Sequence, residues 1–259
     1  MTQDTQTDSQ AFGNFSKHSN CESHRIYYHV AALGHWREIL SEQLRLIAAL
    51  PLGEKVYIGF TGAAHEAGYI WRTADTFGID CEIMFQGSGN ANYEFPTLDR
   101  LHAACLAYEC QKVIYLHTKG ASRIGDWSGI MWRWFMNAYM LTERRMALKA
   151  LNQGDWCAPV ISGGLGEGIL HPVGNFWGAN AEHIRRLVTP SQMRHSFTSL
   201  RQVLKSPDWI HERHAAEMWI ATVSATAVQL HRDEDCDISQ HDWWCRRTDM
   251  QVFATKYGS

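Results

Sequence analysis

The sequence predicts an α/β fold, in which a mostly parallel β-sheet is flanked by helices. Along the first half, segments with strand character alternate with segments of helical period, a pattern typical of parallel strands joined by crossover helices. Residues 112–117, Lys-Val-Ile-Tyr-Leu-His, are mostly apolar, as in a strand that is covered on both faces. The 259 residues are 45% hydrophobic and 20% charged, a globular composition that excludes disorder over most of the chain.

The elements of the first half follow from the spacing of apolar residues and from turn residues. Residues 25–30 predict a short strand, and the apolar period that begins at Trp36 predicts a helix ending near Pro51. The next expected elements are strands at 56–60, 81–85 and 112–117 and helices at 63–77 and 96–110. Ligands gather at the carboxyl ends of strands in such sheets, so residues 117–120 are expected at the ligand-binding edge.

The second half is less regular. We expect a helix at 129–151, a strand at 156–161 and helices at 181–187 and 212–228. The glycine cluster at 163–168 lacks the GxGxxG spacing of a dinucleotide loop and predicts a flexible lid instead. Because no repeat or low-complexity linker interrupts the chain, we expect a flexible tail at 1–23 and a single domain at 24–259.

Charge and cysteine content narrow the location and the partners. A net charge of −3 argues against a general basic field for nucleic acid or anionic membrane, so any phosphate site must be local. The seven cysteines include no CxxC pair, which predicts free thiols in a reducing compartment. The apolar stretch at 130–141 is interrupted by Arg133 and Asn137 and is too short to span a bilayer. With no apolar signal segment in the first 20 residues, we expect a cytoplasmic protein.

The tetrapeptide His117-Thr-Lys-Gly120 is the most informative local motif. A lysine at a strand end, beside a glycine that permits close backbone approach, can meet a diphosphate as a point charge. Arg123 and Arg133 can add charge if the intervening loop folds back. The alternatives are a surface turn with a solvated Lys119 and an Arg133 guanidinium stacked on the neighbouring tryptophans.

Two later segments carry candidate acceptor-binding and catalytic groups. Asn175 and Trp177 combine an amide with an indole face, which suits a sugar, although a buried aromatic corner would look the same. Glu217 lies at the border of an apolar helix stripe with His214 three residues before it, so it is a candidate general base. The alternative for Glu217 is an i, i+4 ion pair with Arg213.

No metal site is predicted. His231, Cys236, His241 and Cys245 have spacings that differ from those of known zinc fingers, so a mixed polar loop is the preferred interpretation. GxSxG, HExxH, Walker A and kinase motifs do not occur in the sequence.

Taken in order, these segments resemble a group of little-characterised glycosyltransferase-like proteins, and more distantly the rhamnan-synthesis glycosyltransferases. The resemblance spans about residues 26–220. The segments that carry it are Tyr93-Glu-Phe-Pro-Thr97, Val113 to Gly120, Trp132-Arg133, His171 with Gly174-Asn-Phe-Trp177, and Arg213 to Ile220.

The resemblance implies a GT-A-like, Rossmann-related domain. Residues 24–125 would form its nucleotide-binding half and residues 126–259 its acceptor half. It implies a transferase in polysaccharide biosynthesis that moves a sugar from a nucleotide-sugar to a glycan or another hydroxyl acceptor. By the same resemblance Glu217 is the base, and Asn175, Trp177 and His214 bind the acceptor.

The sequence departs from most GT-A enzymes at one point. These enzymes place an Asp-x-Asp pair after the strand that here ends in His117-Thr-Lys119, and no such pair is present. We therefore expect His117 and Lys119, with Arg123 and Arg133, to bind the donor diphosphate without a cofactor or a divalent metal. The remaining carboxylates, Asp75, Asp80, Glu94 and Asp99, are unranked candidates for uracil or ribose recognition. The missing pair also leaves open a catalytically silent nucleotide- or carbohydrate-binding module, or a structural partner in a polysaccharide assembly complex.

Overall fold

The computed structural model describes residues 24–52, 54–88, 92–107, 111–123, 125–163, 170–203 and 212–231. Three regions discussed above lie outside these ranges: the expected tail at 1–23, most of the glycine cluster at 163–168, and the cysteines and histidine that follow His231.

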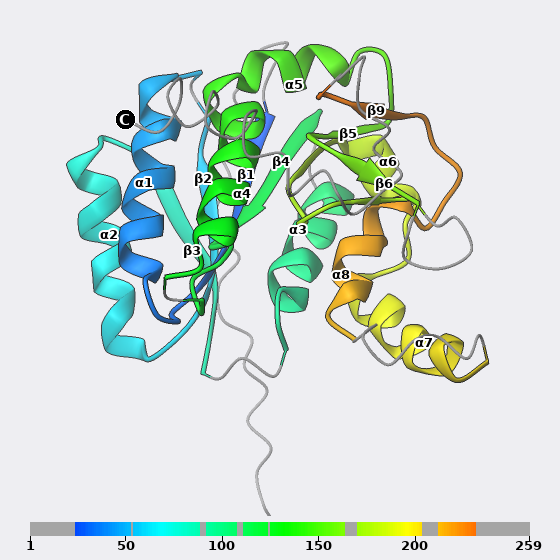
Figure 1. Ribbon diagram of the computed structural model, residues 1–259, viewed down its shortest axis with the longest axis horizontal. Coiled ribbons are helices and arrows are strands. Elements are labelled where there is room, and N and C mark those ends of the chain that lie inside the picture. The colour runs from blue at the N-terminus through cyan, green and yellow to red at the C-terminus, as the bar shows by residue number, and fades with distance from the viewer. Residues whose placement is uncertain are drawn as a thin grey trace, which may run out of the picture.

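The described part contains a sheet of seven strands in the spatial order β3-β2-β1-β4-β8-β5-β9 (Figure 1). The strands are β1 His24–Ala31, β2 Val56–Thr61, β3 Cys81–Gly87, β4 Lys112–His117, β5 Trp156–Ala158, β8 Trp177–Asn180 and β9 Ala227–Gln229. β1 to β4 are parallel to one another, β9 is parallel to β5, and β8 is antiparallel to both β4 and β5. This arrangement confirms the predicted mostly parallel sheet. Two short strands, β6 Ile161–Ser162 and β7 His171–Pro172, form a separate antiparallel pair.

Helices cover both faces of this sheet (Figure 1). One face carries α1 Trp36–Ala49, α2 Ala67–Thr76, α4 Trp127–Asn137 and α5 Arg144–Ala150. The other carries α3 Phe95–Ala107, α6 Ala181–Arg186, α7 Pro190–Val203 and α8 His214–Met218. A short 3₁₀ turn, η1 Ala64–Glu66, precedes α2.

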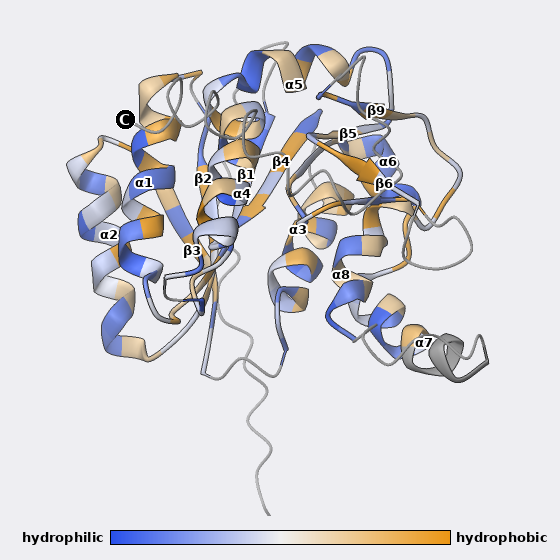
Figure 2. Cartoon of the chain, in the orientation of Figure 1, coloured by the Kyte–Doolittle hydropathy of each residue, from blue (hydrophilic) through white to orange (hydrophobic). Residues whose placement is uncertain are grey.

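Alternation along the strands divides the apolar side chains between two cores. In β1, Ile26 and Tyr28 belong to the core under α1, whereas Tyr27 belongs to the core under α3. In β4, Ile114 and Leu116 are fully buried, and burial of each such side chain contributes about 1.5–3 kcal/mol. Figure 2 shows the same pattern, with hydrophobic strands at the centre and helices striped with hydrophobic and hydrophilic residues.

The second half departs from the expected elements at several places. The expected helix at 129–151 is interrupted by a π-helical segment, η2 Ala138–Thr142. The expected strand at 156–161 is divided between β5 and β6, because Pro159 cannot donate a ladder hydrogen bond. The expected helix at 212–228 ends after α8 and the 3₁₀ turn η3 Trp219–Ala221, because Ala227–Gln229 pairs with β5 as an edge strand. The sequence analysis also missed α7, which in its described part buries Met193 and Phe197.

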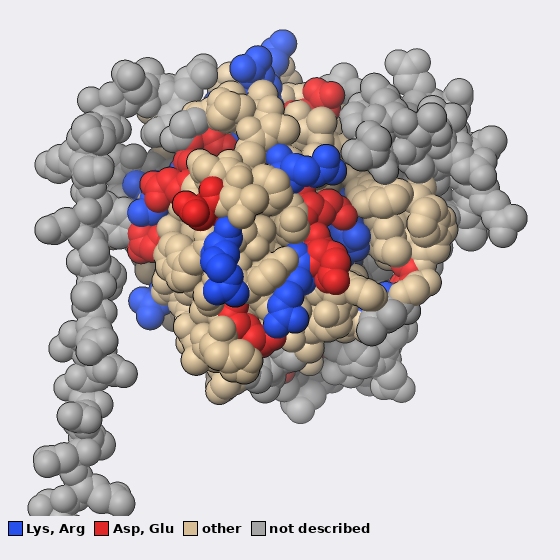
Figure 3. Space-filling view, turned by 90° about the vertical axis from the view of Figure 1, so that its left-hand side faces the viewer, with Lys and Arg blue, Asp and Glu red and all other residues tan. Residues whose placement is uncertain are grey.

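The outer surface over α1 and α2 carries both signs of charge. Figure 3 shows Lys and Arg next to Asp and Glu across this face, and Arg37 pairs with Glu66 at 2.9 Å. Such a face does not provide the continuous positive charge that nucleic acid requires. Among the described helices, none is both long and apolar enough to cross a membrane.

The sheet has its topological switch point between β1 and β4. From β1 the chain adds β2 and β3 on one side, and it then returns to place β4 on the other. The two strands pair in register up to the last residue of β4, where His117 lies opposite His29. In open α/β sheets ligands bind in the crevice outside the carboxyl ends of the strands at such a point.

Candidate functional site

The chain beyond β4 remains attached to β1, and this attachment fixes the corner formed by residues 117–120. The Thr118 amide donates to the His29 carbonyl at 3.0 Å, and the Ala31 amide donates to the Thr118 hydroxyl at 3.0 Å. Gly120 then turns the chain with a φ of +80°, a conformation that side chains disfavour. Lys119 is thus held at the carboxyl edge of the switch point.

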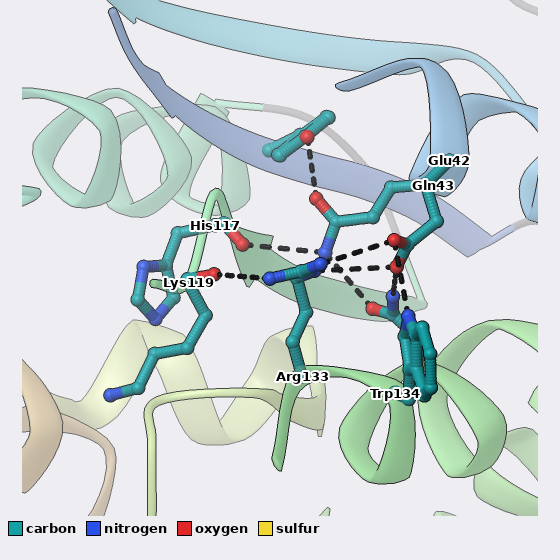
Figure 4. Close-up of polar contacts among 8 residues, drawn as sticks. Glu42, Gln43, His117, Lys119, Arg133 and Trp134 are labelled. Carbon is teal, nitrogen blue, oxygen red and sulfur yellow. Dashed lines mark hydrogen bonds and ion pairs between the residues drawn. The ribbon is translucent and has the colours of Figure 1, made fainter. Parts of the chain in front are cut away.

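A buried polar network supports this corner from the side of α1 and α4 (Figure 4). The Glu42 carboxylate accepts hydrogen bonds from Arg133 Nε at 3.3 Å and Nη2 at 3.2 Å, from Trp134 Nε1 at 3.2 Å and from Asn137 Nδ2 at 2.7 Å. Arg133 Nη1 donates to the Lys119 carbonyl at 3.2 Å. Arg133 is only 6% exposed and its guanidinium is already paired, so it supports the Lys119 backbone rather than facing a diphosphate as expected.

The Lys119 side chain points away from this network. In Figure 4 its ammonium lies on the side of the His117 ring, opposite the Arg133–Glu42 pair. There its charge lowers the pKa of Glu217 and also opposes the rise in the pKa of Glu94. Lys119 therefore shares its surroundings with two carboxyl groups from distant parts of the chain.

Glu217 belongs to α8 and lies near this corner. Burial acts to raise its pKa, but the charge of Lys119, followed by His214, His171 and His117, lowers the pKa below its ordinary value. Glu217 is consequently ionised at neutral pH. The structure thus brings together four of the predicted residues, namely Glu217, Lys119, His117 and His214, and adds His171 from β7.

Glu94, which the sequence left among four unranked carboxylates, is the second carboxyl group of the site. Its Oε2 accepts hydrogen bonds from the Tyr115 hydroxyl at 2.7 Å and from Asn175 Nδ2 at 2.6 Å. Burial raises its pKa, and Glu217 adds to the rise, although His29 and Lys119 act in the opposite direction. The sequence feature that could have singled out Glu94 is its position directly before α3, after the carboxyl end of β3.

His117 is held in one orientation by the segment that follows β7. Its Nε2 lies 2.9 Å from the Gly174 carbonyl, and its ring packs against Phe176 at 5.3 Å. Burial, reinforced by Lys119, lowers its pKa to about 3, so the imidazole is neutral. Gly174 has a φ of +85°, and a Cβ there would lie 2.6 Å from Trp132 Nε1, so glycine is required at this position.

His29 of β1, which lies opposite His117, is a second neutral histidine beside the site. Its Nδ1 lies 2.7 Å from the Thr97 hydroxyl, which belongs to α3. Burial lowers the pKa of His29 to about 4.

Asn175 and Trp177 occupy positions that differ from the expected acceptor surface. Both are 0% exposed, and Trp177 stacks on Tyr115 at 5.0 Å and packs against Trp219 at 6.1 Å. Trp177 Nε1 donates to Asn175 Oδ1 at 2.9 Å, which directs the Asn175 amide nitrogen towards Glu94. A buried indole offers no ring face to a sugar, so these two residues orient Glu94 instead of stacking on an acceptor.

Arg123 is also placed differently from the expectation. Its side chain is 63% exposed and its guanidinium pairs with Asp126 at 3.5 Å. It extends from the loop towards solvent and does not belong to the group around Glu94 and Glu217.

The site therefore combines one ammonium, one ionised carboxylate, one buried carboxyl of raised pKa and several histidines. Within the described ranges, no group of three or more His, Cys, Asp or Glu side chains is arranged to hold a metal ion. Independence of a metal remains a prediction. Chemically, the arrangement can bind an anion at Lys119 and accept a proton at Glu217.

Comparison with known proteins gives a family match and several weak structural likenesses, including the following two. The model of a family described as "Domain of unknown function (DUF8361)" matches residues 25–242, and no match was found among curated proteins. The structures are of glucosyl-3-phosphoglycerate synthase from Mycobacterium tuberculosis. One, with Mn²⁺, UDP and phosphoglyceric acid, has a TM-score of 0.30 at 13% identity over 62% of this chain and 57% of that chain, less than two thirds of its length. The other, with Mn²⁺, UDP-glucose and glycerol 3-phosphate, has a TM-score of 0.36 at 11% identity. The match covers 92% of this chain and 80% of that chain. With TM-scores this low, function has to be argued from the site.

Proposed function

The chain belongs to the family described as domain of unknown function DUF8361, and from its site we propose that it is a glycosyltransferase. It transfers a sugar from a nucleotide-sugar donor to a hydroxyl acceptor, with a glycan of polysaccharide biosynthesis as the acceptor class. One observation supports the proposal: Glu217 lies near enough to Lys119, beside the carboxyl edge of the β1–β4 switch point, for the lysine charge to lower its pKa. A transfer that releases an anionic leaving group and a hydroxyl proton needs both charges.

Lys119 is the proposed partner of the donor diphosphate. The hydrogen bond from Arg133 to its carbonyl fixes its backbone, while its ammonium lies on the side of the His117 ring, away from Arg133 and Glu42. A positioned cation stabilises charge that develops on a leaving diphosphate without any reorganisation at the moment of reaction. In this scheme Arg133 is a positioning residue. The residues proposed to bind the diphosphate of the donor are then Lys119 and the adjacent His117.

Glu217 is the proposed general base. The acceptor hydroxyl attacks the anomeric carbon, its proton passes to Glu217, and the bond from the anomeric carbon to the diphosphate oxygen breaks with its electron pair on the leaving group. The charge of Lys119 favours the ionised form of Glu217 before the reaction, and His214 from the same helix is the proposed contact to the acceptor. General-base catalysis of this kind contributes about 10²–10⁴-fold to the rate.

The donor complex is proposed to form without a divalent ion. Positive charge already present on Lys119 would replace the cation, in keeping with the missing Asp-x-Asp pair. Binding that requires Mn²⁺ and disappears with EDTA would contradict this part of the proposal.

The test is a panel of nucleotide-sugars and nucleoside diphosphates, assayed by thermal shift and by slow donor hydrolysis, with and without EDTA. We expect at least one donor to raise Tm by mass action and to be hydrolysed or transferred. Glu217→Gln should reduce turnover about 10²–10⁴-fold while the Tm shift persists. Glu182→Gln, the same change at a side chain that is 77% exposed, is the matched control and should not alter turnover.

Two outcomes would oppose the proposal. Full turnover by Glu217→Gln would exclude its role as base. A Tm shift with no turnover by the unaltered protein on any donor would favour the silent binding module.

A further inference from the structure

Glu94 and His117 face each other with two atoms that both accept hydrogen bonds. A carbonyl can only accept, so the His117 Nε2 that lies 2.9 Å from the Gly174 carbonyl carries the ring hydrogen. In the neutral imidazole Nδ1 is then a bare lone pair. This Nδ1 lies 3.7 Å from Glu94 Oε1, with the two side chains only 13% and 17% exposed.

The carboxyl group of Glu94 is held in an orientation that directs its Oε1 towards His117 Nδ1. Its Oε2 is occupied by the Tyr115 hydroxyl and the Asn175 amide, and the amide is itself oriented by Trp177. Oε1 is therefore the oxygen that remains for His117 and for a ligand. A proton on Oε1 would convert the repulsion between the two acceptors into a donor–acceptor pair and would leave both hydrogen bonds to Oε2 intact.

Because of the charges around Glu94, its protonation state affects how well a phosphate can bind beside it. The groups facing Glu94 are His29 from β1, Tyr115 and His117 from β4, and Lys119 from the turn after β4. Glu217 faces it from α8, with His214 of the same helix and His171 of β7 near Glu217. With both carboxyls ionised, two negative charges lie beside the ammonium of Lys119 and oppose the binding of a phosphate. With Glu94 neutral, one of these two negative charges is removed, and a phosphate beside Lys119 meets less repulsion.

Resting on the function proposed above, we propose that the phosphates of the nucleotide bind at Lys119 together with one proton, which Glu94 carries on Oε1 towards His117 Nδ1. Glu94 then donates a hydrogen bond in place of presenting a negative charge. Glu217 remains ionised as the base, so the two carboxyl groups have different roles.

The electrostatics agree with this division. Burial raises the pKa of Glu94, whereas Glu217 has a lowered pKa despite the opposing effect of its burial, with Lys119 as the first of the charges that lower it. Environments that separate two carboxyl pKa values in this way are the mark of an acid and a base. Because a bound phosphate favours the neutral form of Glu94 further, its affinity must rise as pH falls, by linkage.

The main experiment is titration calorimetry with UDP in EDTA, in two buffers of different ionisation enthalpy. It is performed above about pH 7.5, where the terminal phosphate is already ionised. We expect uptake of close to one proton per UDP and a Kd that rises up to about tenfold per pH unit. In Glu94→Gln, whose amide mimics the neutral acid, proton uptake should vanish and the Kd should no longer depend on pH. Glu182→Gln should keep both properties of the unaltered protein.

The results separate the inference from the proposed function. UDP binding with no proton uptake, or uptake that persists in Glu94→Gln, would overturn the inference and leave the transferase proposal standing. Failure of every nucleoside diphosphate in the panel, UDP included, to bind would overturn both.

A second measurement requires no nucleotide. The ¹⁵N chemical shifts of the His117 ring should show hydrogen on Nε2 and none on Nδ1 in the unaltered protein at neutral pH. An imidazolium, or hydrogen on Nδ1, would overturn the inference independently of any ligand.

Discussion

The network behind Lys119 leads to a quantitative prediction about Glu42. Its carboxylate accepts hydrogen bonds from three side chains, and one of them is the buried guanidinium of Arg133. Glu42→Ala leaves that guanidinium buried without its counter-charge, which typically costs about 3–5 kcal/mol. The Glu42 side chain is 22% exposed and water can partly replace it, so we expect about 3 kcal/mol.

Urea denaturation and thermal melting measure this cost. For a chain of this size 3 kcal/mol corresponds to a Tm lower by about 6–12 °C. Glu182→Ala removes an exposed pair with Arg185 and should cost less than about 1 kcal/mol. Replacing both Glu42 and Arg133 with Met should cost less than the sum of the single changes, because no buried charge remains. A loss in Glu42→Ala no larger than in Glu182→Ala would refute the reasoning.

Two further predictions concern pH and a close backbone contact. Burial lowers the pKa of His29 from 6.5 to about 4, so the unfolded chain binds more protons and stability, fully present above pH 6.5, falls as pH is lowered towards 4. In His29→Gln the free energy of unfolding, measured by urea denaturation, should fall less steeply between pH 6.5 and 5, by up to about 1.4 kcal/mol per pH unit, and an unaltered slope would contradict the assignment. A Cβ at Gly59 would lie 1.9 Å from the Thr97 hydroxyl, so Gly59→Ala should lower the free energy of unfolding by about 1–3 kcal/mol. Gly68→Ala in α2, where the nearest atom is the end of the Arg72 side chain at 3.3 Å, should be neutral or stabilising, and equal losses in the two variants would exclude the steric explanation.

The first half of the fold could be predicted because its signals are local. The apolar run that ends at His117 coincides with β4, and the period from Trp36 coincides with α1. In the second half, pairing across the sheet overrides local period. Ala227–Gln229 lies in a segment with a helical pattern, yet it forms a strand because β5 offers it a free edge.

The candidate site was predictable only in part. Lys119 and Glu217 could be selected, because a strand end and a helix border are visible in the sequence. The buried state of Arg133 was not visible, because its partner Glu42 lies 91 residues away and only the packing of α1 against α4 brings the two together. The same holds for Trp177 and Glu94, which are connected through Asn175.

The central claim is that the ammonium of Lys119 binds the phosphates of a nucleotide. The most direct measurement is the Kd for UDP in EDTA, by calorimetry, for the unaltered protein, Lys119→Met and Lys55→Met. Lys55 pairs with Glu82 at 3.0 Å near the start of β2, away from the site, so its replacement serves as the control. A charge-assisted hydrogen bond is worth about 1.5–3 kcal/mol, so the affinity of Lys119→Met should fall about 10- to 150-fold while that of Lys55→Met stays near the original value. Equal affinities in the two variants would contradict the account.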